Sequence, residues 1–472
     1  SELFPVLKGK VDDENLIEKV LTEYYTIGSI IPEVKVHGKM VEVHFTSDDA
    51  ITQQFDFNKA SSLCQQGKFK EAIPILKSLI GKNPTNSEFY RTLGQAYSMI
   101  GDDEEGINNL IDALKWNPKN NYALIMIGNI FARNKNDIET ARKYYQQVIE
   151  NNPDDNIAIN NLGTNLIQAG KVDEGLQYLM KAFSINPDYP NTLYGIALVN
   201  QMKGNNDTAF EFALKCIKKC GEGEKGLSRN AQQLILESAQ ALVKTDIGKK
   251  PFDDYRKQLQ KKSGKEIKVE IDNTLDTAAK FEFAEKYDRD YHLVKYNPKH
   301  PAIYHLVMHE LVHLDFATDA RNDNRNKLFI SNFKTKSVFL NDLRQHRQVL
   351  IKKGLSEPSI NEYFDLLFDG INRQIFNAPI DLFIEDKLFQ EYKEIRPYQL
   401  LSLYSLISDG IKATTDKSII SLSPVSILRA SKILNLIGAY QYRDLYGIDL
   451  TGNFKANTLE DKTAKEMYAE FY

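Results

Sequence analysis

Several residue types that mark specialised classes of protein are scarce in this chain. Its 472 residues contain three cysteines, one tryptophan and eight histidines. Three cysteines cannot form a disulfide framework, so we expect a fold that does not need an oxidising compartment. No run of 18 apolar residues occurs, so the sequence predicts no membrane-spanning helix. Neither sign of charge dominates, because 60 Lys and Arg stand against 64 Asp and Glu. This balance predicts no binding of nucleic acid.

The N-terminal residues contain no basic stretch followed by an apolar run, so no signal peptide is visible. The chain starts with Ser1 rather than Met, which leaves open that a leader has been removed. We expect a cytoplasmic protein. Its length corresponds to about two to four domains of ordinary size. The 24 Tyr and 24 Phe provide enough bulk for more than one core.

The first half of the chain carries an internal repeat of 34 or 35 residues. Four columns keep this register, namely prolines (Pro84, Pro118, Pro153, Pro187), small residues (Gly94, Gly128, Gly163, Ala197), a second set of small residues (Ala72, Gly106, Ala141, Gly175, Ala209) and turn residues (Gly67, Gly101, Asn136, Gly170, Gly204). Small residues let two helices approach closely, Gly or Asn allows a left-handed turn between them, and Pro ends the second helix. The pattern resembles the tetratricopeptide repeat (TPR) family, with five units from about Asp56 to Cys220.

The resemblance implies a concave groove that binds a peptide or another domain. A positively charged clamp for a C-terminal carboxylate is not expected in this groove. Arg91 is the only positively charged residue at the positions of the repeats from which such a clamp would project. Two alternatives stay open: the groove, around Arg91, Gln95, Asn129 and Asn160, recruits a partner protein, or it packs on the rest of the chain. Farther along, Cys216 and Cys220 are interpreted as buried thiols rather than metal ligands, because no ligand partners lie near them in the sequence.

Composition and periodicity divide the chain into three parts. Residues 1–54 are expected to form a small α+β cap, residues 55–245 a TPR solenoid with a capping helix, and residues 246–472 an α+β domain. The Gly-rich segment Gly221–Gly226 is the best candidate for a linker. The predicted elements around these boundaries are a helix at Glu14–Tyr25, strands at Glu33–Val36 and Val41–Phe45, a helix at Asn230–Val243, a strand at Lys265–Ile271, a helix at Thr274–Tyr287 and a strand at His292–Tyr296.

A helix expected to start at Pro301 carries the most informative residues of the chain. His309, Glu310 and His313 form an H-E-x-x-H motif. Two histidines four residues apart lie on one helical face and can share a zinc ion, and Glu310 is placed to take a proton from a water at the metal. Chance alone predicts roughly 0.01 such motifs in a chain of this composition, so we expect metal binding.

Other histidines do not complete this site. His305 lies one turn upstream of His309, and about 12 Å of helix separates it from His313, which is too far for a shared ion. We interpret His305 as structural or as a partner of a ligand. Asp315, two residues after His313, is a candidate acceptor for a ligand histidine. The histidine that follows His313, His346, lies in a charged helix and is interpreted as a solvated side chain.

The segment resembles the zincin metallopeptidases, whose active-site helix follows the edge strand that binds the substrate backbone. The resemblance implies a third ligand from a carboxylate on a later helix, as in the gluzincin branch. The strongest candidate segment contains Asp381 and Glu385, four residues apart on one face. Gluzincins with an E-x-x-x-D helix use Glu as the ligand and Asp to orient a histidine. The order here is reversed, so we favour Glu385 and keep Asp381 as the alternative.

The sequence therefore predicts a mainly α chain, in which a TPR solenoid precedes an α+β, zincin-like metallopeptidase domain. The expected function is zinc-dependent hydrolysis of peptide bonds, with Zn²⁺ on His309, His313 and Glu385 and with Glu310 as general base. The expected partners are a peptide or protein substrate and a protein bound in the TPR groove. The alternative is a TPR interaction scaffold whose zincin-like domain is inactive or structural. The substrate, the choice between endo- and exopeptidase action, and the oligomeric state stay open.

Overall fold

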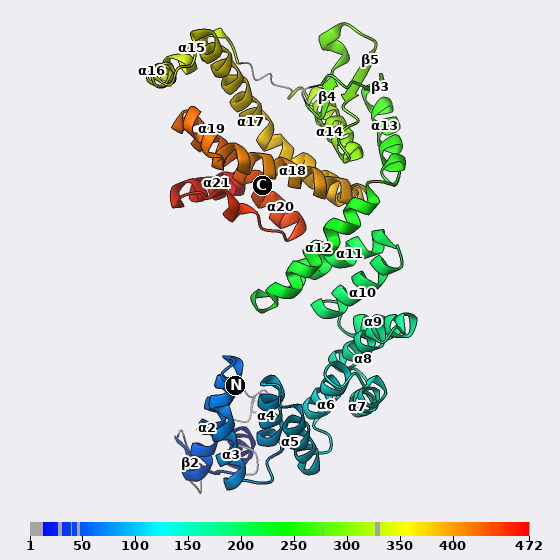
Figure 1. Ribbon diagram of the computed structural model, residues 1–472, viewed down its shortest axis with the longest axis vertical. Coiled ribbons are helices and arrows are strands. Elements are labelled where there is room, and N and C mark those ends of the chain that lie inside the picture. Colours follow the sequence, from blue (N-terminus) through cyan, green and yellow to red (C-terminus); the bar gives the residue numbers. More distant parts are fainter. Residues whose placement is uncertain are drawn as a thin grey trace. The chain divides into compact units, whose positions relative to one another are not determined.

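The computed structural model describes residues 13–26, 31–38, 40–44, 48–275, 277–325 and 331–471, and it is mainly helical (Figure 1). The chain forms two compact units, Ser1–Ile185 (the repeat unit) and Asn186–Tyr472 (the C-terminal unit). This division falls inside the predicted repeat array. The boundaries predicted near residues 54 and 245 stay predictions.

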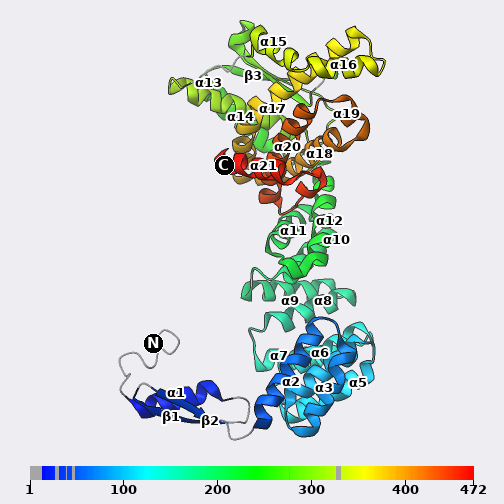
Figure 2. The same cartoon turned by 90° about the vertical axis from the view of Figure 1, so that its left-hand side faces the viewer.

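The N-terminal elements of the repeat unit agree with the sequence prediction. Helix α1 (Glu14–Tyr25) precedes strands β1 (Glu33–His37) and β2 (Met40–His44), which pair in antiparallel orientation (Figure 2). The predicted end of the second strand, Phe45, lies outside the described residues. The side chain of Glu18 accepts a hydrogen bond of 2.9 Å from the backbone N–H of Val36, which ties α1 to the hairpin.

Within its described residues the repeat unit continues as four helix pairs, each packed against the next. The residues predicted to turn the chain between paired helices have positive φ, from 52° at Asn136 to 90° at Gly101, as the pattern required. The pairs are α2 (Asp48–Gln65) with α3 (Phe69–Lys82), α4 (Ser87–Met99) with α5 (Asp103–Trp116), α6 (Asn121–Arg133) with α7 (Ile138–Asn151), and α8 (Asn156–Gln168) with α9 (Val172–Ile185).

The small residues hold paired helices in close contact. A Cβ atom added at Gly175 on α9 would lie 2.6 Å from the carbonyl oxygen of Gly163 on α8, and one added at Gly163 would lie 2.9 Å from the carbonyl oxygen of Gly175. Backbone atoms cannot move aside as a flexible side chain can. The helix pair therefore requires glycine at both positions.

We expect Gly175→Ala to lower the free energy of unfolding of the repeat unit by about 1–3 kcal/mol, because the added methyl group forces α8 and α9 apart. Gly81→Ala is the matched control, since Gly81 lies near the end of α3, where an added Cβ atom would meet no other atom within 4 Å. Alanine restricts the unfolded chain more than glycine does, so the control should be neutral or stabilising by up to about 1 kcal/mol. Urea denaturation followed by circular dichroism measures both variants. Equal urea midpoints for the two variants would contradict the close contact between α8 and α9.

The C-terminal unit begins with a fifth helix pair, α10 (Pro190–Met202) and α11 (Asn206–Lys219). The expected linker forms a short 3₁₀ helix, η2 (Glu222–Glu224), in which the backbone N–H of Gly221 donates a hydrogen bond of 2.9 Å to the Glu224 carboxylate. It leads directly into α12 (Lys225–Leu242), which packs against α11 as a capping helix should.

The fifth helix pair is also joined to the helices that follow it. The guanidinium Nη1 of Arg396, on α18, lies 3.1 and 3.0 Å from the two carboxylate oxygens of Glu211, on α11. Helix α12 packs against α18 as well. The last repeat pair and the C-terminal helices therefore form one compact body.

The sheet of the C-terminal unit differs from its prediction. Strands β3 (Glu266–Ile271), β4 (Ala279–Glu282) and β5 (Tyr291–Tyr296) are ordered β3-β5-β4, with β3 parallel and β4 antiparallel to β5. The helix predicted over Thr274–Tyr287 is wrong, because pairing of β4 with β5 overrides the local helical spacing. The strand before the H-E-x-x-H helix, β5, lies in the middle of the sheet, and β4 forms the edge.

Helix α14 (Ile303–Asn322) packs against β4 and β5, and the long helix α17 (Glu357–Glu391) packs against α14. Within the described residues, no helix combines the length and the apolar character needed to cross a membrane. The cytoplasmic location stays a prediction. The remaining helices of the unit are α13 (Lys249–Ser263), α15 (Phe333–Asp342), α16 (Arg344–Lys352), α18 (Arg396–Thr415), α19 (Lys417–Leu422), α20 (Val425–Tyr446) and α21 (Thr458–Phe471), with the 3₁₀ helices η3 (Ala284–Tyr287), η4 (Lys393–Ile395) and η5 (Thr451–Phe454).

Candidate metal centre

Helix α14 holds the motif on the half-buried side of an otherwise buried helix. Its apolar residues on the opposite side, Val307, Met308, Leu311, Val312 and Leu314, are all at most 2% exposed and belong to the core of the unit. His309, Glu310 and His313 are only partly buried. The core therefore fixes the helix and leaves the motif side chains accessible to a ligand.

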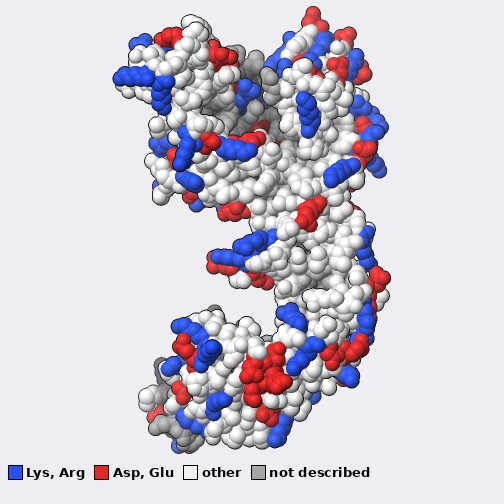
Figure 3. Space-filling view, viewed as in Figure 1, with Lys and Arg blue, Asp and Glu red and all other residues white. Residues whose placement is uncertain are grey.

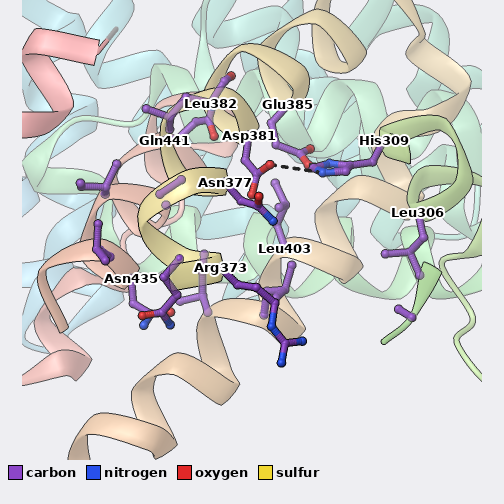
Figure 4. A pocket seen from close by; sticks show the side chains of 18 of the residues that line it. Leu306, His309, Arg373, Asn377, Asp381, Leu382, Glu385, Leu403, Asn435 and Gln441 are labelled. Atoms are coloured by element: carbon purple, nitrogen blue, oxygen red, sulfur yellow. Dashed lines mark hydrogen bonds and ion pairs between the residues drawn. The ribbon is translucent and has the colours of Figure 1, made fainter. Parts of the chain in front are cut away.

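Asp381 on α17 approaches both histidines of the motif. Its Oδ1 lies 3.4 Å from Nε2 of His309 (Figure 4). The same atom lies 3.8 Å from Nε2 of His313. Two ligand atoms at about 2.0–2.1 Å from a tetrahedral zinc ion are separated by roughly 3.3–3.4 Å. The observed spacing is close to this value. Oδ1 of Asp381 is also a buried atom without a hydrogen-bond partner in the described residues, as expected of an atom that faces a cation.

Glu385, one turn further along α17, lies on the other side of His309. Its Oε1 is 2.8 Å from Nδ1 of His309, and its Oε2 is 2.8 Å from Nε2 of His305. The carboxylate of Glu385 thus contacts Nδ1 of His309. This contact fixes the orientation of the ring, so that its other nitrogen, Nε2, faces Asp381. This geometry favours the alternative, Asp381, over Glu385 as the third ligand.

Buried polar groups hold Glu385 in place. Nε2 of Gln399, on α18, lies 2.6 Å from Oε2 of Glu385, and the hydroxyl of Tyr446, on α20, donates a hydrogen bond of 2.8 Å to Oε1 of Gln399. His305 completes this set through its contact with Glu385, so it lies behind the residue that orients His309 rather than beside a proposed ligand. Gln399 and Tyr446 belong to no motif, so the sequence contained no signal that could have identified them.

Asp315 does not contact a ligand histidine, contrary to the expectation. It is buried, and its carboxylate accepts hydrogen bonds of 2.8 Å from the hydroxyl of Tyr255 and 2.5 Å from Nζ of Lys262. Both partners lie on α13, so Asp315 fastens α14 to α13. His346 is partly buried, and its Nε2 lies 2.7 Å from the backbone carbonyl oxygen of Leu422.

Burial, the neighbouring carboxylates and the contacts between the histidines together set the pKa values of His309 and His313. Burial lowers the pKa of His309, but Asp381 and Glu385 raise it well above its ordinary value. Burial and the neighbouring His309 lower the pKa of His313 to about 4, so this ring is neutral and able to bind a metal at neutral pH. Burial raises the pKa of Glu385, but His305 and His309 outweigh burial and lower it.

Glu310 lies between the histidines and the edge strand. Burial raises the pKa of its carboxyl, against the lowering effects of His309 and of the backbone of Phe281 on β4. A carboxylate with a raised pKa is a better proton acceptor at neutral pH than an exposed one. The role of Glu310 as a general base stays a prediction.

The centre lies in a groove between β4 and α17. One pocket of about 460 Å³ extends from His305 and His309 toward α18 and α20, and a second extends past His313 toward the aromatic rings of Phe281 and Phe316. Glu310 lines both pockets. Figure 3 shows the surface hollowed between α14 and α17, with charges of both signs interspersed on the face drawn. The first pocket falls within the size range of ligand pockets, about 300–1,000 Å³.

Comparisons with known proteins bear on the repeats. Family models described as "Tetratricopeptide repeat" match residues 63–130, 122–155 and 158–189. Residues 63–189 are tetratricopeptide repeats. The repeat prediction is thus confirmed for this region. The zincin-like domain stays a prediction.

Parts of the chain are also similar to proteins of known identity. The BBSome complex member bbs-4 of Caenorhabditis elegans is 25% identical over 207 residues, which are 42% of this chain and 45% of that protein. A probable UDP-N-acetylglucosamine–peptide N-acetylglucosaminyltransferase SPINDLY of Hordeum vulgare is 24% identical, over 34% of this chain and 17% of that protein. The solved structure of PilW, a type IV pilus biogenesis factor, matches with 14% identity and a TM-score of 0.34, over 40% of this chain and 92% of PilW. The chain thus spans less than half the length of the two curated relatives, bbs-4 and SPINDLY.

Proposed function

We propose that the C-terminal unit is a zinc-dependent peptidase and that the TPR array brings protein partners or substrates to it. The observation that carries the proposal is the cluster of His309, His313 and Asp381, whose ligand atoms all lie within 4.8 Å of one another beside Glu310. Three protein ligands leave one tetrahedral position open, which is typical of catalytic zinc sites and not of structural ones.

In this proposal His309, His313 and Asp381 hold the metal, and Glu385 orients His309. When bound, zinc would supply Lewis-acid chemistry, which polarises a carbonyl and acidifies a water. Glu310 accepts the proton of the attacking water and passes it to the leaving amine as the peptide bond breaks. The raised pKa of Glu310 supports both halves of this transfer.

Strand β4 supports a peptide as the substrate. It pairs with β5 on one side and lies at the edge of the described sheet on the other, next to the motif helix. An extended peptide can add to such an edge through its main-chain groups, which recognises a backbone rather than a particular side chain. The scissile carbonyl would then lie over Glu310, between the two pockets of the groove.

One observation favours a second candidate function. The matched family models lie within residues 63–189 and concern the repeats, so they support a TPR interaction scaffold independently of any chemistry in the C-terminal unit. In this alternative the metal, if bound, stabilises the fold. A measurement of peptide hydrolysis distinguishes the peptidase from the interaction scaffold.

Removal and return of the metal tests the proposal. We expect about one zinc per chain in protein purified without chelator, measured by mass spectrometry, and cleavage of a broad peptide library. Dipicolinate should remove the metal and reduce cleavage to background, and one equivalent of zinc should restore it, with circular dichroism as the control for folding. Protein without zinc affinity would contradict the proposal. Protein that binds zinc but cleaves no peptide would support the scaffold alternative.

A further inference from the structure

Arg373 is a charged side chain in the groove that the proposed reaction does not use. It lies on α17 two turns before Asp381 and lines both pockets. Among the described residues that line the first pocket, it is the one with a permanent positive charge. Figure 4 shows Asp381, Asn377 and Arg373 in this order along one side of α17. Arg373 is therefore placed to contact a bound peptide at some distance from the metal ligands.

Arg373 is an exposed side chain, and its guanidinium has no partner among the described residues. No hydrogen bond or ion pair joins it to any residue that the structure describes, and the same is true of Asn377, one turn closer to the centre. Other arginines near the groove are engaged; Arg396, for example, binds the carboxylate of Glu211. A planar cation with five N–H donors that opens into a groove is suited to a carboxylate.

Helices α18 and α20 supply the wall of the first pocket opposite the proposed metal ligands. This wall is mostly apolar, with the side chains of Leu403, Leu406, Ile407, Leu434 and Ile437 beside the polar side chains of Asn435 and Gln441. Of these, Leu406 is 60% exposed, a large exposure for a leucine that borders a pocket. Covering such a surface with an apolar side chain is favourable. The pocket is thus suited to a large apolar residue of the substrate.

The direction of strand β4 indicates which part of a bound peptide would lie near Arg373 and the apolar wall. Ala278, just before β4, borders the first pocket, Ala279 at the start of the strand borders both, and Phe281 and the residue that follows the strand, Phe283, border the second. A peptide paired with β4 in the more stable antiparallel direction runs toward the start of the strand. The first pocket therefore receives residues on the C-terminal side of the cleaved bond.

We infer that Arg373 binds a carboxylate on the C-terminal side of the scissile bond, so that preferred substrates have a large apolar residue after that bond and a carboxylate soon after it. The inference deepens the proposed peptidase function and rests on it for the cleavage step. Eight residues of helix separate Arg373 from Asp381, about 12 Å along the axis. An extended peptide advances about 3.3 Å per residue, so the carboxylate follows within about four residues. It comes from the peptide's C-terminus or from an acidic side chain.

Matched peptides test the inference on the full-length, zinc-loaded protein. The parent peptide is acetylated Ala-Ala-Phe-Leu-Ala as the free acid, compared with its C-terminal amide and with amides ending in Glu or Gln in place of the last Ala. We expect kcat/KM to be about 10–100-fold higher for peptides that carry the carboxylate, which corresponds to one hydrogen-bonded charge pair. A preference for the free acid identifies a terminal carboxylate, and a preference for Glu over Gln identifies a side chain.

Variants of Arg373 connect this preference to the residue. Arg373→Met should abolish the preference by raising KM for the carboxylate-bearing peptides to the value measured for the amide, because the guanidinium lies away from the reacting atoms. Arg373→Lys should retain part of the preference, since it keeps the charge but not the two-pronged geometry. An unchanged preference in Arg373→Met would overturn the inference.

Binding separates this inference from the proposed hydrolysis. Fluorescence anisotropy with labelled acid and amide peptides is measured on Glu310→Gln protein and on the Glu310→Gln, Arg373→Met double variant. Tighter binding of the acid, by about tenfold and only when Arg373 is present, supports the carboxylate site even if the wild-type protein cleaves none of the peptides. In that case only the peptidase proposal fails. Equal binding of acid and amide to both proteins, or no binding at all, would overturn the inference.

Discussion

Glu310→Gln should lower peptide hydrolysis by about 10²–10⁴-fold and leave the zinc content of the protein unchanged. Glutamine has almost the same size as glutamate, but its amide cannot accept a proton at neutral pH. The ion pairs of the centre join Asp381 and Glu385 to histidines of α14, and within the described residues none of these pairs includes Glu310. The substitution therefore removes the base and leaves the ligands in place.

The fold should tolerate this change as well. Glu310 is partly buried and its pKa is raised by burial, so the charged carboxylate is not stabilised by its surroundings in the metal-free protein. Replacing it with a neutral amide should leave the melting temperature unchanged or raise it slightly. A strong loss of stability would show that Glu310 has a structural role.

Glu362→Gln provides the control for Glu310→Gln, because Glu362 lies on the exposed face of α17. It should keep wild-type activity, zinc content and melting temperature. Initial rates on the peptide library, zinc by mass spectrometry and thermal melts are compared for the three proteins. If Glu310→Gln and the wild type cleave at equal rates, the activity belongs to a contaminant or depends on another base.

The repeats could be predicted from the sequence because each helix pair is made by local contacts. A turn residue such as Asn136 needs positive φ, and Gly163 and Gly175 meet within a single pair, so the pattern recurs wherever the structure recurs. The H-E-x-x-H motif is local for the same reason. Four residues of helix bring His309 and His313 to one face without help from the rest of the chain.

The parts that could not be predicted depend on contacts between distant segments. Strand β4 forms by pairing with β5, and its own spacing indicated a helix instead. Gln399 reaches Glu385 only because α18 folds back on α17, and no local pattern marks it. The choice between Asp381 and Glu385 likewise depends on which nitrogen of His309 each one meets. That depends on the relative placement of α14 and α17, whose residues His309 and Glu385 are 76 positions apart in the sequence.

Asp381→Asn should remove most of the zinc, because it takes away one of three protein ligands and leaves an amide, which is a poor ligand for zinc. Glu385→Gln should retain zinc with an affinity reduced by about 10–100-fold, the usual effect of losing the partner that orients a ligand histidine. Its amide oxygen still accepts a hydrogen bond, so the ring of His309 keeps one acceptor. Asp381→Asn should therefore weaken zinc binding more than Glu385→Gln does.

Competition with a fluorescent zinc chelator measures both affinities, and thermal melts of the metal-free proteins show whether either substitution unfolds the unit. Asp369→Asn, on the exposed face of the same helix, is the control and should bind zinc as the wild type does. The reverse order, with zinc lost from Glu385→Gln and kept by Asp381→Asn, would make Glu385 the ligand that the sequence favoured. In the expected order, the first carboxylate of the D-x-x-x-E pair binds the metal and the second orients a histidine. The roles then follow position along the helix and not the identity of the residue.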